Sequence, residues 1–117
     1  MNSLNINDTY AKLSSEVRDK LSIIASNILN KEGSKLSSVN LKIVTNKEIA
    51  KLNKIFRGKD SPTNVLSFTN DDISKNVTNS LGDIAISYEF VEVEAVKQGK
   101  NISDHLMHML AHGYIIY

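Results

Sequence analysis

Residues 38–58 read SVNLKIVTNKEIAKLNKIFRG, and this stretch decides the fold class. Apolar and polar side chains alternate over Ser38–Val44, which is the period of a β-strand with one buried face. Thr45 and Glu48 then have the spacing of a capping box, so a helix is predicted to begin here. The apolar positions that follow recur at helical spacing up to Arg57-Gly58. A strand that leads directly into a helix indicates a protein that mixes both elements.

The stretches on either side continue this mixed pattern. We predict a short edge strand at Leu4–Ile6 and strands at Val65–Phe68 and Leu81–Ile86, with helices over Ser14–Gly33, over Tyr88–Gln98 and from Asn101–Asp104 onward. The polar segment 70–80 is predicted to be an exposed connection. No repeat or linker divides the chain. The prediction is therefore a single α+β domain, residues 1–117, with a small mixed sheet packed with helices.

Composition restricts the classes of function. The chain has 117 residues, 41% of them apolar and 23% charged, and its net charge is +1, so nucleic-acid binding would need a local basic patch. It contains no cysteine, which excludes disulfides and thiolate metal sites. No apolar run has the length of a membrane helix, and the polar N-terminus lacks a signal peptide. We expect a cytoplasmic protein without membrane association.

One loop gathers charge around a glycine and the single proline. It lies within FRGKDSPTNVLSF, residues 56–68. The Arg57 guanidinium has the planar fork that holds a phosphate with two hydrogen bonds. The residues alone favour a plainer interpretation, a helix-to-strand connection with solvated charges. Asp83, in the sequence LGDI, is either a partner of Arg57 across the sheet or the start of a strand.

All three histidines fall in the last predicted helix. His105, His108 and His112 are three and four residues apart and share one stripe. His108 and His112 have the i, i+4 spacing with which two imidazoles reach one metal ion. No carboxylate lies between them, so the general base of a zincin peptidase is missing. A packed core helix is an equally good interpretation.

A metal site built from these histidines alone is a further alternative. The three would span about 10 Å along the helix, which strains coordination of one ion. The pair His108 and His112 would need a ligand from elsewhere, such as Asp83 or Asp104. This alternative remains open from the residues.

Three stretches in fixed order change the interpretation: LNKIFRGKDSPTNVLSF (52–68), LGDIAIS (81–87) and HMLAHG (108–113). Together they resemble the YbeY family of bacterial rRNA maturation factors and single-strand-specific endoribonucleases, over most of the chain from about residue 40. The resemblance implies a small α+β metal-hydrolase fold. It also implies a helix with the motif H-G-x-L-H and a later third histidine, which together bind one zinc ion.

The resemblance also implies an activity and partners. The activity is zinc-dependent cleavage of single-stranded RNA in small-subunit rRNA 3′-end maturation and ribosome quality control. The expected partners are single-stranded rRNA and the small ribosomal subunit, and DNA is not expected. Arg57 matches an arginine of the family's active-site cleft, so it is the candidate catalytic residue.

The metal half of the motif departs from the family. His112-Gly113 matches the start of H-G-x-L-H, which makes His112 the candidate first zinc ligand. The second histidine would stand at position 116, which is Ile116, and the third would fall beyond Tyr117. We therefore expect a chain truncated within the zinc motif, with weak or absent zinc binding and impaired catalysis. The alternative is a non-catalytic RNA- or ribosome-binding remnant of the same fold.

Overall fold

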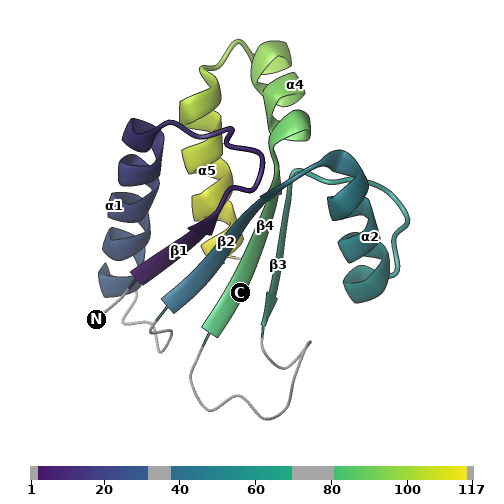
Figure 1. Cartoon of the computed structure of the whole chain (residues 1–117), viewed down its shortest axis with the longest axis horizontal. Coiled ribbons are helices and arrows are strands. Elements are labelled where there is room, and N and C mark those ends of the chain that lie inside the picture. Colours follow the sequence, from purple (N-terminus) through teal and green to yellow (C-terminus); the bar gives the residue numbers. More distant parts are fainter. Residues whose placement is uncertain (1–2, 32–37, 70–80, 116–117) are drawn as a thin grey trace.

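The computed structural model describes residues 3–31, 38–69 and 81–115 (Figure 1). Its elements in chain order are β1 Ser3–Asn7, α1 Ser15–Lys31, β2 Ser38–Val44, α2 Asn46–Arg57, β3 Val65–Thr69, β4 Leu81–Ser87, α4 Tyr88–Gln98 and α5 Ile102–Ile115. None of the helices in these ranges is long and apolar enough to cross a bilayer. The predicted connection 70–80 and the predicted stop at Gly33 lie outside the described residues.

The four described strands form one mixed sheet in the order β1-β2-β4-β3. β1 pairs with β2 and β2 with β4 in parallel, whereas β3 runs antiparallel to β4. β1 lies at an edge, as predicted, and β3 forms the opposite edge. The sequence-based class, α+β with a small mixed sheet packed with helices, is confirmed.

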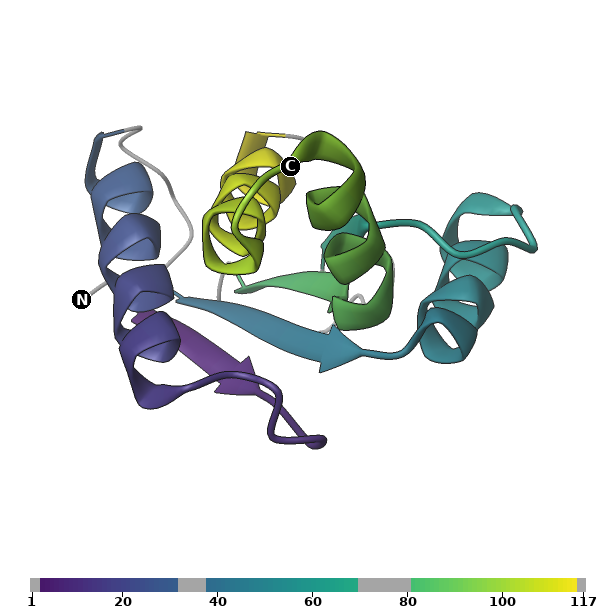
Figure 2. The ribbon, with the colours of Figure 1, turned by 90° about the horizontal axis from the view of Figure 1, so that it is seen from above.

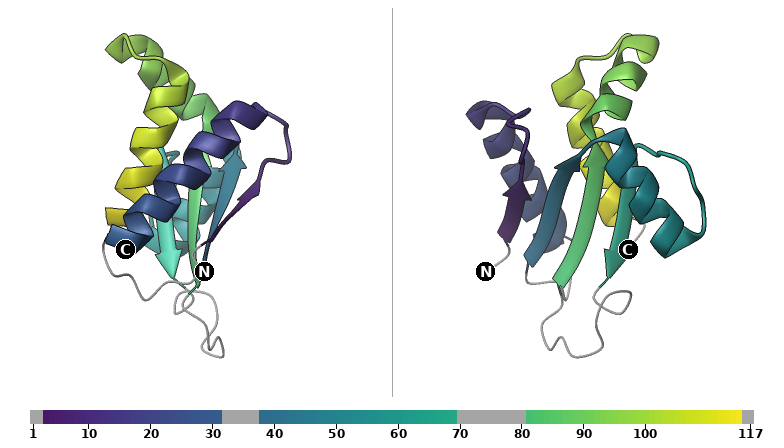
Figure 3. Two further views of the ribbon diagram at one scale, coloured as in Figure 1. Left: turned by 90° about the vertical axis from the view of Figure 1, so that its left-hand side faces the viewer. Right: turned by 45° about the vertical axis from the view of Figure 1, so that its right-hand side comes forward.

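Helices cover the two faces of the sheet unequally. Figure 2 shows α1, α4 and α5 on one side, and in the right-hand view of Figure 3 α2 lies in front of the sheet at β3 and β4, with α5 behind them. Strand side chains alternate between the two faces, so they form two buried clusters. The larger cluster contains Leu21, Ala25, Val39, Leu41, Ile43, Val65, Ile84, Ile86, Val91, Leu106, Met109 and Leu110. The smaller one, under α2, contains Val44, Ile49, Leu66, Phe68 and Ala85.

The start of α2 contains the predicted capping box. The Glu48 N–H donates to Thr45 Oγ1 at 3.2 Å, and Glu48 Oε1 accepts from the Thr45 N–H at 3.1 Å. The Tyr10 hydroxyl, from the segment after β1, also donates to Glu48 Oε1 at 2.9 Å. The hydrogen bond from Tyr10 and those from Thr45 hold the pKa of Glu48 below its ordinary value of 4.5. The cap therefore joins the segment after β1 to α2 through an ionised carboxylate.

This cap predicts an acid-dependent loss of stability. Because the pKa of Glu48 is lower in the folded state, its contribution is present above pH 4.5 and is lost as pH falls through the folded-state pKa. Glu48→Gln keeps the capping hydrogen bonds but removes the charge. We expect this variant to be less stable than wild type at neutral pH, with a difference that vanishes in acid. Urea unfolding at several pH values measures it, and a pH-independent difference would contradict the assignment.

Candidate functional site

Arg57 and Gly113, the residue after His112, both form hydrogen bonds with Ser67 in β3. The Arg57 guanidinium donates to the carbonyl oxygens of Phe56 and Ser67, at 2.9 Å to the former. The Ser67 hydroxyl donates to the Gly113 carbonyl oxygen at 2.8 Å. Segments far apart in sequence, the end of α2 and the end of α5, thus meet across one edge strand. We call Arg57, Ser67 and His112-Gly113 the Ser67 junction.

Local structure fixes the α2 side of the Ser67 junction. α2 ends at Gly58, whose φ of 72° is a left-handed conformation that glycine adopts without strain. The side chain of Asn53, which is buried, donates to the Ser61 carbonyl at 2.9 Å and shapes the loop that follows. Phe56 stacks on Phe68 of β3 with ring centroids 4.7 Å apart. These contacts hold the exposed Arg57 against β3.

The α5 side depends on the absence of a side chain at Gly113. A Cβ at this position would lie 3.1 Å from two carbon atoms of Ile84 and 3.3 Å from Ser67 Oγ. Glycine therefore permits α5 to approach β3 and β4 closely. The neighbouring His112 is exposed. The H-G pair thus places an accessible imidazole next to a tightly packed backbone contact.

The three histidines predicted to share one stripe differ in exposure: His105 is buried, whereas His108 and His112 are exposed. His105 is 2% exposed, and its Nε2 lies 3.1 Å from Glu94 Oε1. His108 is exposed, with Nδ1 3.4 Å from the Lys100 ammonium. Within the described ranges, no three histidine or acidic side chains are placed to hold one metal ion.

Two metal sites were considered from the sequence: one made by all three histidines, and one made by His108 and His112 with Asp83 or Asp104. Both predictions are wrong for the described residues. The three-histidine site fails because His105 packs in the core, where its Nε2 is hydrogen-bonded to Glu94. The structure also places Asp83 in β4, buried and opposite Phe68. Its pairing with Arg57 stays a prediction.

Sequence reasoning missed the group around Glu94. Its carboxylate accepts from Asn64 Nδ2 at 3.2 and 3.4 Å, and Asn64 Oδ1 accepts from the Val65 N–H at 2.7 Å. With His105, this group connects α4, α5 and the first residue of β3. No spacing or motif signals it, because His105 and Asn64 lie 11 and 30 residues away from Glu94 in the sequence. Ser67 escaped notice for the same reason.

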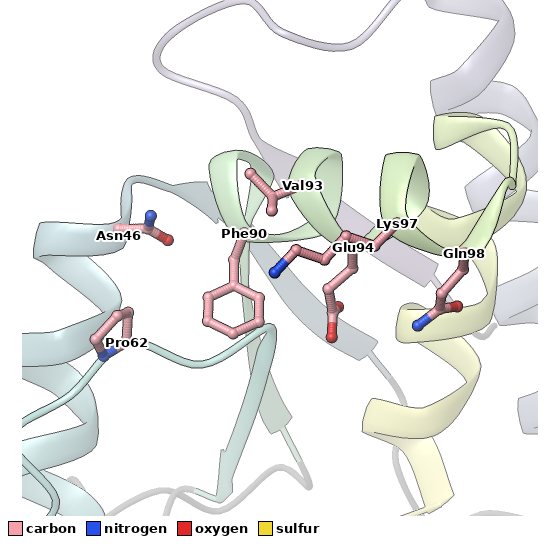
Figure 4. Close-up of a pocket in the computed structure, with 7 residues that line it drawn as sticks. All are labelled: Asn46, Pro62, Phe90, Val93, Glu94, Lys97 and Gln98. Carbon is pink, nitrogen blue, oxygen red and sulfur yellow. The ribbon is translucent and has the colours of Figure 1, made fainter.

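A pocket of about 470 Å³ lies between α4 and the loop before β3 (Figure 4). It is lined by Asn46, Pro62, Phe90, Val93, Glu94, Lys97 and Gln98. Its volume lies in the range of small-ligand sites. The carboxylate of Glu94 on its wall already serves His105 and Asn64, so the pocket borders the group that positions α5.

Comparisons with known proteins agree with this architecture. The family model for Endoribonuclease YbeY matches residues 3–115. A protein named Endoribonuclease YbeY from Vesicomyosocius okutanii is 40% identical over 95 residues, which cover 81% of this chain and 66% of that protein. The same-named protein of Francisella philomiragia is 37% identical over 126 residues, covering 98% of this chain and 76% of that protein.

The fold has a similar solved structure. The solution structure of TM1509 from Thermotoga maritima matches with a TM-score of 0.63 and 29% identity, over 95% of this chain and 69% of that one. The Francisella tularensis relative, 41% identical, is covered over only 55% of its length. The chain thus spans between about half and three quarters of these relatives. By its sequence match over residues 3–115, the chain belongs to the YbeY family.

Proposed function

We propose that this chain acts on single-stranded RNA as a YbeY-type endoribonuclease with a weakened metal site. The observation that carries the proposal is the Ser67 junction, which holds Arg57 and His112-Gly113 at one strand. An exposed guanidinium at the end of α2 and an exposed imidazole at the end of α5, joined through Ser67, suit a phosphodiester backbone. The proposed substrate is rRNA of the small subunit during 3′-end maturation and quality control, in the cytoplasm.

The residues present fit a catalytic zinc ion poorly. Such an ion takes three protein ligands and keeps one position open, where a bound water becomes a nucleophile near neutral pH. Among the described residues, His112 stands without two further ligands. Position 116, where the resemblance expects the second histidine, is isoleucine. The described residues therefore do not complete a zinc site, and we propose that cleavage is impaired.

Restoring one ligand tests this proposal. Ile116→His should raise zinc affinity about tenfold or more, because each imidazole supplies a share of the total binding free energy. His112→Ala in the same background should remove the gain. Zinc affinity is measured by competition with a chelating dye, and cleavage with a labelled single-stranded RNA. Stoichiometric zinc and robust cleavage by the wild-type chain would contradict the proposed impairment.

A second candidate function is RNA or ribosome binding without catalysis. Ile116 favours it, because the substitution affects the metal half of the site and leaves Arg57 in place. Arg57→Ala should then weaken RNA binding and lower the salt dependence by about 0.7 for one lost phosphate contact. Arg57→Lys keeps the charge and is the matched control. Unchanged affinity and unchanged salt dependence in Arg57→Ala would count against both candidates.

A further inference from the structure

The described helices differ strongly in charge. α2 contains four cationic side chains and one carboxylate, a net charge of +3, although the whole chain has a net charge of only +1. α4, on the opposite side of the loop before β3, contains three glutamates and one lysine, a net charge of −2. The basic helix is the one that ends at Arg57. A polyanion that approaches the Ser67 junction is thus attracted along α2 and repelled along α4.

The lysines of α2 form a line on its outer face. Lys47, Lys51 and Lys54 follow one another at steps of four and three, so they share a stripe about 10 Å long. All three are exposed. The buried side of the helix, around Ile49 and Asn53, faces the opposite way. We call these three lysines the lysine track. Lys54 also neighbours Arg57, three residues later on the helix surface.

Few carboxylates lie close enough to the lysine track to neutralise its positive charge. Glu48, the only acid within α2, is directed to Tyr10 and Thr45. Among the described residues, neither Lys47 nor Lys51 lies within ion-pair distance of a carboxylate. Lys54 lies 3.9 Å from Asp60, and both of those side chains are exposed. A solvent-screened contact of this kind contributes little. Lys47 and Lys51 therefore present ammonium groups with three donors each, and Lys54 adds a third whose contact with Asp60 is open to solvent.

We propose that the lysine track binds the phosphate backbone of single-stranded RNA and guides it toward Arg57. The inference rests on the proposed function and adds the path by which the strand reaches the Ser67 junction. Lysine contacts of this type follow the backbone without reading bases. The track therefore raises affinity and association rate for any sequence, while Arg57 holds a phosphate at the Ser67 junction.

The experiment compares charge-matched double variants. Log affinity falls as log salt rises, and the double variant Lys47→Ala with Lys51→Ala should make this fall less steep. The slope should lose about 1.4 in magnitude, or about 0.7 per lost phosphate contact. Alanine favours the helix, so α2 should remain folded. Lys20→Ala with Lys97→Ala removes the same charge from α1 and α4 and should leave the slope unchanged. Lys47→Arg with Lys51→Arg should also behave as wild type. The probe is a fluorescently labelled uridine oligonucleotide, followed by anisotropy.

The outcomes separate this inference from the proposed function. If Arg57→Ala weakens binding while the Lys47/Lys51 variant keeps the wild-type slope, the track is refuted and the RNA function stands. An equal loss in the Lys20/Lys97 control would also refute the track, since the effect would then follow net charge alone. Absence of salt-dependent binding by wild type would overturn the RNA function and the track together.

Discussion

Gly113→Val is expected to lower the free energy of unfolding by about 3 kcal/mol, through overpacking in a filled core. The Cβ alone would lie 3.1 Å from two carbon atoms of Ile84, a side chain that is fully buried. The two methyl groups of valine enlarge the conflict, and valine is a weaker helix former than alanine. The shift should push α5 from β3 and lengthen the Ser67–Gly113 hydrogen bond. Urea unfolding measures the loss, and wild-type stability would contradict the close packing.

A double-mutant cycle tests the cause. Gly113→Ala gains about 1 kcal/mol of helix propensity, which offsets part of an overpacking cost of about 1–3 kcal/mol. Ile84→Val removes Cδ1, one of the two close atoms, at a cost of about 0.5–1.5 kcal/mol by itself. The double variant should be more stable than the sum of the single effects predicts, by about 1 kcal/mol. Additive effects would show that Ile84 is not the obstacle.

Glu94→Ala is expected to cost about 2–3 kcal/mol of stability, because the hydrogen bonds to its carboxylate are lost while one donor, His105, stays buried and the other, Asn64, stays half-buried. His105 is 2% exposed, and its Nδ1 has no hydrogen-bond partner among the residues that the structure describes, so the loss of Glu94 leaves both ring nitrogens unpaired there. Asn64 loses its acceptor at the start of β3 as well. The effect should appear as a lower urea midpoint with an unchanged slope.

Two variants on the same helix serve as controls. Glu94→Gln keeps an acceptor oxygen for His105 and should retain more stability than Glu94→Ala. Glu92→Ala removes an equal charge from an exposed position and should change stability by less than about 0.5 kcal/mol. If Glu92→Ala and Glu94→Ala lose equal stability, the loss follows the negative charge of α4 and not the contact with His105. The proposed role of that contact would then be wrong.

Local signals in the sequence predicted most elements of the fold. The alternation at Ser38–Val44, the capping box at Thr45 and the helix end at Arg57-Gly58 act within a few residues, and the structure has each of them. The strand order and the antiparallel direction of β3 were not predicted. They depend on which hydrophobic faces pack together across the whole chain, and local periodicity does not contain that information.

The candidate site shows the same division. Arg57 and His112 came from a family resemblance, and their roles stay predictions. Ser67, which joins their segments, lies inside a largely apolar strand, and no motif around it indicates a site. His105 looked like a possible ligand because helical spacing shows which residues share a face of the helix. It does not show which of those residues are buried. Its burial against Glu94 depends on how α4 packs against α5, which is a tertiary effect.

The hydrogen bond from Arg57 to the Ser67 carbonyl has a consequence for the protein in solution. β3 is an edge strand, and the exposed backbone groups of such strands are templates on which a second chain adds by strand pairing. A charged, branched side chain that occupies a carbonyl in the middle of this strand obstructs such addition. The residue proposed to hold RNA is thus also placed to hinder the addition of another strand at this edge.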